Sequence, residues 1–472
     1  MSTVTDSQIF RNIFSTPASS EVWSDRTRTA YYLQFEAALA TAQAHLGIIP
    51  TKAAEAITEK CNIDLIDMEE LRKETERIGY PVLGVVKQIV RLVNQVEPGL
   101  GEWAHWGATT QDVTDTATIL QLRDTCFLVS ESLRDITSEL EKLAKKYAAT
   151  PMAARSNLQQ AVPITFGFKL SRLLATFRRH QQRLSEILPR LLVVEFSGAA
   201  GTLATLYPGA SSTSQDPETI FQLQLDLANQ LDLNVPEIAW HTERDRIAEI
   251  GSLFSLIAGT CSKFALDMKL LMQTEVGEVY EPYYPHRGSS STMPQKRNPI
   301  ASVYITAMGS TIRQLSAALF DAMVEDHERS TGPWEIEWIV LPQMCTMIHA
   351  VLTHTQSVLE GLEVDEERMK RNLELTRGAV VSEAVMMGLG KTMGRQVAHD
   401  LVYELCMKAI KEDRPLVDLL EESEEVKKVG MGRHELEGLC EPGNYLGLSE
   451  EMVRRVVDLP SHAQTEADSV LI

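Results

Sequence analysis

The chain has 472 residues, of which 44% are hydrophobic and 23% charged, the balance of a soluble globular protein. This length exceeds one ordinary core and predicts two to four domains. The formal net charge of −20 argues against nucleic acid or an anionic membrane surface as a partner. An acidic protein that binds an anionic substrate must concentrate its few cations locally.

Six cysteines are scattered along the chain without a Cys-x-x-Cys pair, namely Cys61, Cys126, Cys261, Cys345, Cys406 and Cys440. Their mostly apolar helical surroundings favour buried free thiols in a reducing compartment over disulfides or a metal site. The first residues lack a basic segment followed by an apolar one, and no apolar run approaches membrane-spanning length. We therefore expect a cytoplasmic protein with no membrane partner.

Helical periodicity dominates the chain. Residues 1–20 are polar and are expected to form an arm, and a helix is predicted from Ser24 to Leu46, where a Gly and then a Pro end it. Further helices are predicted at 51–61, 67–77, 82–97, 113–148, 162–190, 214–232, 245–276, 300–325 and 336–361. Alternating strand patterns are nearly absent, so the sequence predicts an all-α fold.

The longest predicted helices have about 30 residues, or ~45 Å. Their apolar faces point in more than one direction, which suggests a bundle that extends into partner subunits. After residue 363 the composition changes to shorter helices with an acidic run that is most simply a solvated face. We divide the chain into an N-terminal helical domain (1–112), a central long-helix bundle (113–363) and a C-terminal helical domain (364–472).

A Gly-rich loop at 98–112 runs into the first long helix and ends in Ala-Thr-Thr-Gln-Asp. Backbone N–H groups and small hydroxyls at a helix start suit a carboxylate, which makes Thr109 and Thr110 candidate substrate ligands. Thr110 and Asp112 could instead be ordinary helix caps, which is the favoured interpretation for isolated residues. Four further irregular stretches between the long helices are rich in functional side chains, at 151–163, 195–209, 236–246 and 326–338.

The stretch from Gly288 to Pro299 reads Gly-Ser-Ser-Ser-Thr-Met-Pro-Gln-Lys-Arg-Asn-Pro. It has no hydrophobic period and is predicted to be a loop. A Ser beside a Lys can act as a base, because the ammonium and nearby backbone N–H groups stabilise the alkoxide. Lys296 and Asn298 could hold a carboxylate whose charge grows as a carbanion forms. The alternative is a Ser-rich surface loop without chemistry.

This stretch closely resembles the signature loop of the aspartase/fumarase superfamily, Gly-Ser-Ser-x-Met-Pro-x-Lys-x-Asn-Pro. The resemblance implies a mainly helical, three-domain homotetramer with a twenty-helix core, active sites where three subunits meet, and elimination through an aci-carboxylate. It also implies Ser290 as the base, with Lys296 and Asn298 on the substrate carboxylate. Ser289 stands where the superfamily has a Gly, with Gly288 one place earlier, so a neighbouring Ser stays open as the base.

Two departures narrow the resemblance to one branch. Many members pair a His in the second conserved stretch with a Glu seven residues beyond the signature Lys, whereas this chain has Asn157 and Val303 there. The His of the first domain, expected near 80–82, is absent as well. Losing both halves of a His–Glu pair is coherent, because a buried carboxylate without its partner is costly. The pattern resembles the 3-carboxy-cis,cis-muconate cycloisomerase branch, which keeps Leu-Gln-Gln-Ala at 158–161.

The resemblance implies a cofactor-independent enzyme that acts on an unsaturated di- or tricarboxylate through a carbanion-like or aci-carboxylate intermediate. Cycloisomerisation of 3-carboxy-cis,cis-muconate is the first expectation. Trans-aconitate decarboxylation to itaconate, found in the same branch, is the alternative, and adenylosuccinate lyase-like elimination is a third. From another class, a non-catalytic protein on this scaffold is disfavoured because Ser290, Lys296 and Asn298 are all present.

A tricarboxylate site needs several cations and neutral donors. The predicted substrate ligands are Thr109, Thr110, Arg155, Asn157, Gln159, Arg297, Asn298 and Arg329. His241 and His327 are candidate general acids, although each could be a packed or surface residue. The His and carboxylate spacings predict no metal site, and no dinucleotide or P-loop motif is present, so no cofactor is expected.

Overall fold

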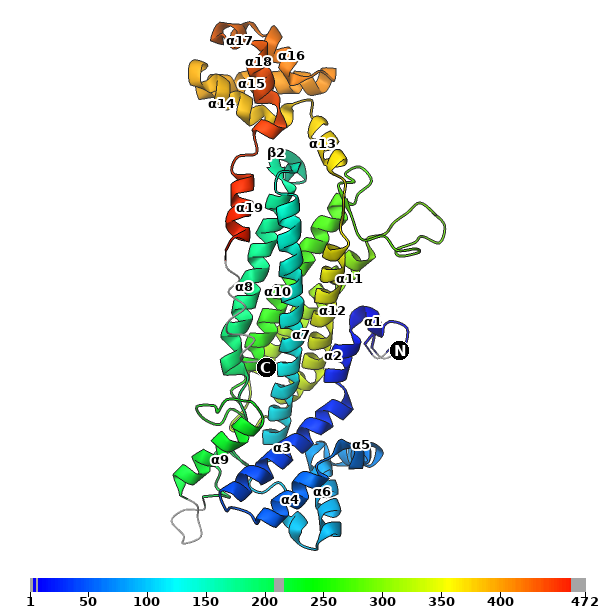
Figure 1. The fold of residues 1–472 in the computed structure, drawn as a ribbon, viewed down its shortest axis with the longest axis vertical. Helices are drawn as coiled ribbons and strands as arrows, with labels where there is room; N and C mark the ends of the chain where they lie inside the picture. The colour runs from blue at the N-terminus through cyan, green and yellow to red at the C-terminus, as the bar shows by residue number, and fades with distance from the viewer. Residues whose placement is uncertain (1–2, 6, 208–215, 460–472) are drawn as a thin grey trace.

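The computed structural model describes residues 3–5, 7–207 and 216–459. The molecule is elongated, with long helices in the middle, shorter N-terminal helices at one end and a helical cap at the other (Figure 1). The bundle contains α7 (Thr110–Lys146), α8 (Phe166–Leu191), α10 (Asp245–Leu271), α11 (Ile300–Ala322) and α12 (Pro333–Glu360). These helices begin and end within a few residues of their predicted bounds, and the all-α prediction is confirmed.

The N-terminal helices pack at the lower end of the bundle in Figure 1. Ser24 begins the longest of them by accepting a hydrogen bond from the backbone N–H of Thr27, and Asp67 does the same for Glu69 and Glu70. The elements of this end are α3 (Asp25–His45), α4 (Thr51–Lys60), η1 (Ile63–Leu65), α5 (Met68–Ile78), α6 (Val82–Val96), η2 (Leu100–Trp103) and, later in the chain, α9 (Pro217–Gln230). The helix predicted at 214–232 therefore begins partly outside the described residues.

The expected N-terminal arm is more ordered than its sequence indicates. Short helices α1 (Arg11–Phe14) and α2 (Pro17–Val22) lie against the bundle. Thr16 Oγ1 lies 2.7 Å from His349 Nδ1, and the ring of Phe14 packs edge-on against Tyr304 at 5.6 Å. These contacts with α11 and α12 hold a segment whose polar sequence gave no helical period.

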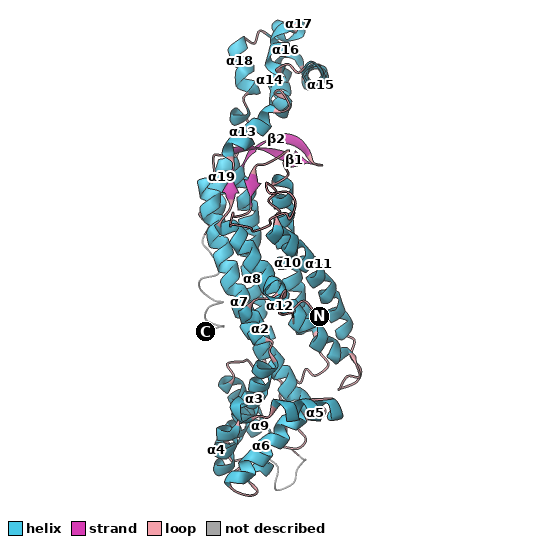
Figure 2. Ribbon diagram, turned by 90° about the vertical axis from the view of Figure 1, so that its right-hand side faces the viewer, coloured by secondary structure: helices cyan, strands magenta, loops and turns pink. Residues whose placement is uncertain are grey.

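The stretch at 151–163, expected to be irregular, forms most of an antiparallel hairpin of β1 (Pro151–Ser156) and β2 (Gln159–Thr165), visible at the upper end of Figure 2. Asn157 and Leu158 form its two-residue turn with φ of +50° and +64°. Positive φ at both positions is typical of a type I′ turn, which Asn favours at its first central residue. A second small sheet pairs β3 (Val279–Tyr280) with β4 (Glu363–Val364).

The cap has a hydrophobic cluster of its own, in which Val385, Val402 and Leu420 are buried. Its elements are α14 (Ser382–Met393), α15 (Arg395–Glu412), α16 (Leu416–Glu422), α17 (Glu424–Val429), α18 (Arg433–Cys440) and η4 (Pro442–Asn444), and α13 (Glu366–Glu374) and η3 (Ala379–Val381) lead into it. The chain then returns, because α19 (Ser449–Val457) packs on α8 and adds Val453 to the main core. The predicted domain boundaries at 112 and 363 stay a prediction, and residues 460–472 of the last domain lie outside the described part.

Helix α12 differs from the expectation that no apolar run approaches membrane-spanning length. Its length and composition would allow it to cross a membrane, but 61% of its most apolar 18-residue stretch is buried inside the protein. Val340, Met344 and Val351 are among its buried core residues. The apolar character of α12 is therefore explained by its place in the bundle, next to α7, α10 and α11.

Candidate active site

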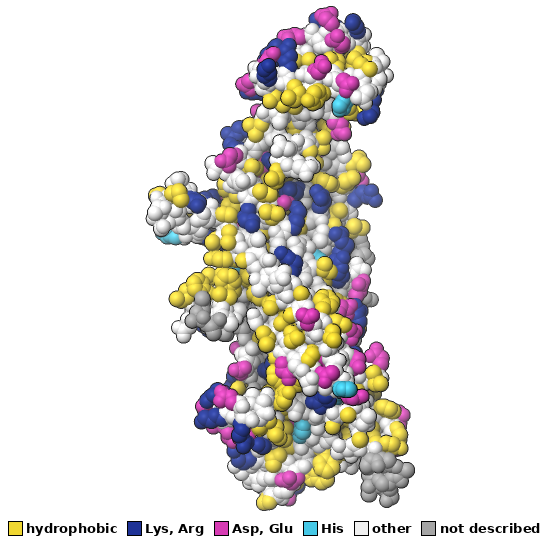
Figure 3. All heavy atoms as spheres, turned by 180° about the vertical axis from the view of Figure 1, so that it is seen from behind, with side chains coloured by type: hydrophobic (Ala, Val, Ile, Leu, Met, Phe, Trp, Pro, Cys, Tyr) yellow, Lys and Arg dark blue, Asp and Glu magenta, His cyan; other side chains and the backbone are white. Residues whose placement is uncertain are grey.

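The predicted site residues fall into three groups at two ends of the bundle. Thr109, Thr110, His241, His327 and Arg329 lie at the lower end, where α7 and α12 begin. The signature loop and the hairpin lie at the upper end, and in Figure 3 the loop stands out from the side of the bundle. The other predicted residues are in these two elements, namely Ser290, Lys296, Arg297 and Asn298 in the loop and Arg155, Asn157 and Gln159 in the hairpin.

The length of helix α12 measures the distance between the lower end of the bundle and the signature loop at its upper end. Near its start, Trp334 donates a hydrogen bond from Nε1 to Asp115 of the lower group, at 3.0 Å. Three residues past its end, Glu363 forms an ion pair with Arg297 of the signature loop. The 28 residues between these points make a helix ~42 Å long. A single chain therefore cannot place the loop and the lower group around one small substrate.

Asp112 organises the start of α7. Its Oδ2 accepts hydrogen bonds from the backbone N–H groups of Thr109 and Gly198, at 2.9 and 3.0 Å, and its Oδ1 accepts one from Ser197 at 3.1 Å. Asp112 is thus a helix cap, as one interpretation of the sequence proposed, and it also ties α7 to the 195–207 segment. Three backbone donors stabilise the ionised carboxylate in a fully buried position.

His241 is the fourth partner of Asp112. Its Nε2 lies 2.7 Å from Asp112 Oδ1 and 3.7 Å from Glu195 Oε1, and the residue is only 3% exposed. Burial acts to lower the pKa of His241, but the hydrogen bond to Asp112 and the negative charge of Glu195 outweigh it, so the pKa is raised. The imidazole, directly behind the start of α7, is therefore protonated more readily than a free histidine.

Glu195 lies beside this pair. Its Oε2 accepts a hydrogen bond from the backbone N–H of Trp240 at 2.7 Å, and Oε1 has no hydrogen-bond partner among the described residues. Burial raises the pKa of Glu195 to about 7, with the charge of His241 opposing the shift. Glu195 can therefore take up or release a proton near neutral pH, next to a charged imidazole.

Asp112, Glu195 and His241 also lie close enough to hold one metal ion, since their ligand atoms are within 4.8 Å of one another. The hydrogen bonds argue against that use. Each oxygen of Asp112 already accepts two donors, which occupies the lone pairs that an ion would need. The cluster is better described as a network that shares protons, and the sequence gave no hint of it because its members are far apart in the chain.

Arg329 is the cation that faces the start of α7. Its Nε donates to Gln111 Oε1 at 2.6 Å, and its Nη1 donates to Thr109 Oγ1 at 3.1 Å and to the carbonyl of Ala199 at 3.2 Å. The structure thus brings two predicted ligands, Arg329 and Thr109, into direct contact. Thr110 is the first residue of α7, next to them. A guanidinium, a hydroxyl and a helix N-terminus together can bind a carboxylate.

His327 is two residues from Arg329 and is exposed, with φ of +52°. Its segment is closed by Asp326, which accepts hydrogen bonds from the backbone N–H and Oγ1 of Thr331 at 2.9 to 3.0 Å. The two candidate acids therefore differ: His241 is buried and paired, whereas His327 is free to meet a ligand from solvent. Which of them protonates a substrate stays a prediction.

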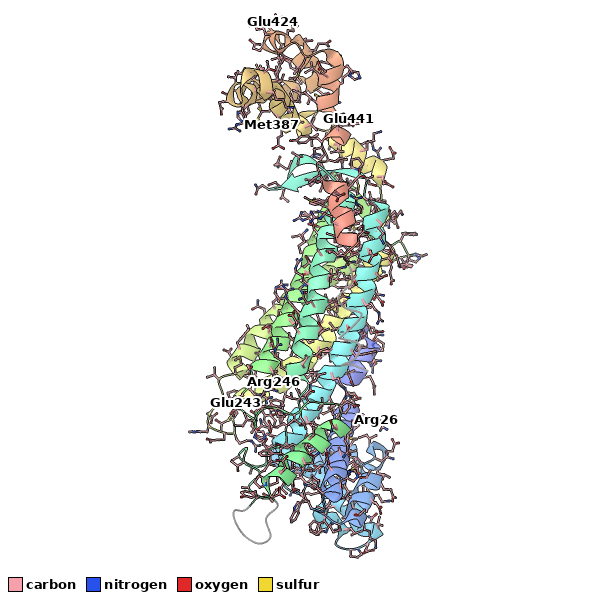
Figure 4. All side chains as sticks on the ribbon, turned by 60° about the vertical axis from the view of Figure 1, so that its left-hand side comes forward. Arg26, Glu243, Arg246, Met387, Glu424 and Glu441 are labelled. Carbon is pink, nitrogen blue, oxygen red and sulfur yellow. The ribbon has the colours of Figure 1, made fainter. Side chains whose placement is uncertain are left out.

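A buried ion cluster supports this end of the molecule. Arg244, just before α10, binds Asp115 through both terminal nitrogens at 2.8 and 3.0 Å, and binds Glu337 at 2.6 and 2.9 Å. Gln111 donates from Nε2 to Asp115 at 3.1 Å and to the carbonyl of His241 at 2.8 Å. In Figure 4, Glu243 and Arg246, which flank Arg244 in the sequence, mark this lower end of the bundle. Gln111 links the cluster to Arg329.

In the signature loop, Ser290 Oγ faces backbone donors. It accepts hydrogen bonds from the N–H groups of Met293 and Thr292 at 3.1 and 3.4 Å. Such donors stabilise a serine alkoxide and so favour Ser290 as a base. Gly288 has φ of +67°, and a Cβ there would lie 2.4 Å from the carbonyl oxygen of Asn298. This close approach explains why the glycine stands at 288 and not at 289.

The three polar residues that follow in the loop have different environments. Lys296 is exposed and has no ion-pair partner within the described part of the chain. Arg297 pairs with both oxygens of Glu363 at 3.0 and 3.1 Å, and Asn298 donates from Nδ2 to the carbonyl of Gly288 at 2.8 Å. Lys296 is thus available to a ligand, whereas Arg297 and Asn298 hold the loop in shape. All three stay predictions as substrate ligands.

In the hairpin, Arg155 forms a bidentate pair with the buried Glu278, at 2.6 and 2.9 Å. Its charge is therefore already balanced inside the protein. Asn157 and Gln159 lie at the exposed tip, beside Leu158, which is 76% exposed.

Comparison with known families decides the class of this protein. The family model described as lyase matches residues 12–313, and the one described as the C-terminus of adenylosuccinate lyase matches residues 378–456. The chain belongs to the aspartase/fumarase superfamily.

Several superfamily members match the chain over nearly its whole length. Trans-aconitate decarboxylase 1 of Mycosarcoma maydis is 54% identical over 96% of this chain and 89% of the relative. The 3-carboxy-cis,cis-muconate cycloisomerase of Pseudomonas aeruginosa is 41% identical over 97% of each chain. The crystal structure of 3-carboxy-cis,cis-muconate lactonizing enzyme from Pseudomonas putida superposes with a TM-score of 0.88 at 39% identity, covering 96% of this chain and 98% of that one. The chain is an enzyme of the lyase and isomerase type that this superfamily contains.

The departures from the superfamily pattern now have a structural description. Asn157 occupies a hairpin turn, where its positive φ is well tolerated. Val303, seven residues beyond Lys296, lies on the first turn of α11 and is 44% exposed. The start of α11 is instead capped by Glu281, which accepts hydrogen bonds from the backbone N–H groups of Ala301 and Ser302 at 3.1 and 2.8 Å.

The sequence did not identify several polar residues at the lower end as part of the site, and superfamily motifs alone do not mark them. These residues are Glu36, Glu195 and Arg244. Glu36 is an example: its Oε1 lies 2.6 Å from Nδ1 of His105, across 69 residues of sequence. The usable signal was the run of four polar residues, Thr109 to Asp112, at the predicted start of the first long helix.

Proposed function

We propose that this enzyme decarboxylates an unsaturated tricarboxylate of the trans-aconitate type, with itaconate as product. The observation that carries the proposal is the 54% identity to trans-aconitate decarboxylase 1 over 96% of the chain. Cycloisomerisation of 3-carboxy-cis,cis-muconate is the second candidate, supported by 41% identity to a cycloisomerase. Adenylosuccinate lyase-like elimination comes third.

The decarboxylation makes definite demands on the site. The bond between the CH2 carbon and its carboxylate breaks, and the electron pair shifts across the double bond to the carbon next to the other terminal carboxylate. A proton is then added at that carbon, and CO2 and itaconate result. The transition state places extra negative charge on the remaining carboxylates, so cations and N–H donors at fixed positions lower the barrier. Arg329, Lys296 and the start of α7 would supply them.

We also propose that the active site is assembled between chains of a homotetramer. Its support is the ~42 Å length of α12, which separates Ser290 from Arg329 within one chain. A groove of about 770 Å³ between α8 and α10 adds to it, because apolar residues such as Leu170 and Leu256 line it beside Arg172 and Lys263. The free cysteines fit the cytoplasmic location that we propose for the enzyme.

A proton NMR time course with trans-aconitate and, separately, 3-carboxy-cis,cis-muconate tests the reaction, with CO2 followed in parallel. We expect loss of trans-aconitate with one equivalent of CO2. Lactone formation without CO2 would establish the second candidate in its place. Turnover of neither acid, with adenylosuccinate cleaved, would overturn both.

A further inference from the structure

Glu325 is a buried acid that the proposed reaction does not use. It follows α11 by three residues, and its side chain is 0% exposed. Neither carboxylate oxygen has a hydrogen-bond partner among the described residues. An ionised carboxylate in such a position is strongly unfavourable, because it loses its hydration without gaining donors.

The charges around Glu325 do not compensate for its ionisation. The nearest cation is Arg244, whose Nε lies 3.9 Å from Glu325 Oε1. Arg244 is already shared by Asp115 of α7 and Glu337 of α12, and Glu335 of α12 adds a further negative charge nearby. One guanidinium thus faces two bound carboxylates before Glu325 is counted. A third would leave the cluster with a clear excess of negative charge.

The pKa of Glu325 agrees with this geometry. Burial raises it to about 8, with Arg244 opposing the shift and the three other carboxylates adding to it. Near pH 7 the side chain is therefore mostly a neutral carboxylic acid, which can stay buried beside the ion cluster at little cost.

Glu325 is connected to Arg329 in two ways. The first is along the chain: the 323–332 segment follows α11, contains Glu325, is closed by Asp326 and Thr331, and carries Arg329. The second is through Gln111, which binds both Arg329 Nε and Asp115 of the cluster. The position of the Arg329 guanidinium is therefore set by the same buried cluster that Glu325 enters.

We infer that Glu325 is a positioning residue for Arg329, and that the segment 323–332 is correctly placed only while the Glu325 carboxyl is protonated. Loss of this proton puts an uncompensated charge beneath the segment and displaces Arg329 from Gln111 and Thr109. The inference rests on the proposed function only in taking Arg329 as a ligand of a substrate carboxylate. It predicts an enzyme that loses substrate affinity, more than turnover, as the pH rises above about 8.

The kinetic test compares the wild-type enzyme with Glu325→Gln, which keeps the size of the side chain and cannot ionise. Asp321→Asn is the matched control, because it removes a carboxylate from an exposed position four residues earlier, near the end of α11. We expect KM to rise at least about tenfold for wild type and the control as the pH increases from roughly 6.5 to roughly 9.5. For Glu325→Gln, KM should stay within about twofold, with kcat similar in all three. A KM profile of Glu325→Gln that matches wild type would overturn the inference.

Two readouts do not depend on the reaction. In infrared difference spectra of wild type between acid and alkaline pH, a protonated-carboxyl band should disappear with a midpoint near 8. In Glu325→Gln this band should be missing, and only the band of Glu195, with a midpoint near 7, should remain. Because the folded state holds this proton more tightly than the unfolded chain, where a Glu has a pKa of about 4.3, folding stability should fall as the pH rises from that value to about 8. The Tm of Glu325→Gln should decline less than that of wild type over this range, since Glu195 contributes to the decline in both proteins. If both readouts behave as expected and no acid is turned over, the proposed function fails while the state of Glu325 stands; absence of the band contradicts the inference itself.

Discussion

Nε2 of His241 lies 2.7 Å from Oδ1 of Asp112, and the two side chains are buried side by side although 128 residues separate them in the chain. The contact joins the start of α7 to the segment before α10. It makes Asp112 a cap, a cross-link and the counter-ion of an imidazolium at once.

Replacing Asp112 with Asn should therefore cost more than the loss of a helix cap. We expect the free energy of unfolding at pH 6 to fall by about 3 kcal/mol or more, the cost of leaving one member of a buried ion pair without its partner. Urea denaturation followed by circular dichroism measures it. Asp216→Asn is the control, because Asp216 caps the exposed start of α9, and the change should cost less than about 0.5 kcal/mol since Asn caps a helix about as well as Asp.

The same pair gives a pH dependence. The pKa of His241 is raised in the folded protein, so the pair contributes fully below the pKa of an unfolded His, about 6.5, and its contribution is lost as the pH rises through the folded-state pKa. The difference in stability between wild type and Asp112→Asn should thus be larger at pH 6 than at alkaline pH. A difference that does not change with pH would show that His241 is neutral throughout.

Gly288→Ala should abolish most activity without unfolding the protein. The new Cβ would lie 2.4 Å from the carbonyl oxygen of Asn298 and would force the signature loop into another shape. Because the loop is exposed, the fold should survive, while kcat/KM falls roughly 100-fold from the misplaced Ser290. Gly79→Ala is a matched control, since Gly79 also has positive φ but nothing lies within 4 Å of its Cβ position. Equal loss of activity in both variants would contradict the role of the loop.

Two inactive variants should restore each other if the site is shared between chains. Ser290→Ala and Arg329→Ala change opposite ends of the bundle, so a mixed tetramer would contain some sites with both residues intact. We expect activity to return when the two proteins are mixed and allowed to exchange subunits. A mixture of Ser290→Ala with Lys296→Ala should stay inactive, because both changes lie in one loop. Failure of the first mixture, with exchange shown by mass spectrometry, would place the site in one chain.

A substitution at the hairpin tip can distinguish a structural role of Asn157 from a functional one. Glycine tolerates positive φ, so Asn157→Gly should keep the turn and its stability while it removes the side-chain amide. We expect kcat/KM to fall at least about tenfold, as for the loss of one polar contact to substrate. Leu158→Gly changes the neighbouring turn residue and should retain activity. Full activity of Asn157→Gly would reduce Asn157 to a turn residue.

The long helices could be predicted from the sequence because each carries a 3.6-residue period over many turns, as α11 does. The hairpin could not, because its turn is Asn-Leu and lacks the Asn-Gly signal, and its strands pair only with each other. The short helices α1 and α2 were missed since their order comes from contacts with the bundle and not from their own composition.

For the site, local motifs were enough to find residues but not their partners. Ser290 and Lys296 were recognisable from a specific loop sequence. That Arg297 would be bound by Glu363, or Arg155 by Glu278, depends on residues 66 and 123 positions away and has no local signal. The same holds for Glu325. In the sequence it is an ordinary acidic residue after a helix, and only the structure shows that its side chain is buried.

The return of α19 to the bundle changes what the cap is. Although it comes near the end of the chain, the cap is an insertion between two elements that pack on the bundle. The chain enters the cap through α13 and leaves it toward α19. Both ends of the described chain pack on the bundle: α1 and α2 contact α11, α12 and α7, and α19 contacts α8 and α7. The cap could therefore be exchanged or enlarged in evolution without changing the bundle, whereas truncating the chain after the cap would remove α19 from the main core.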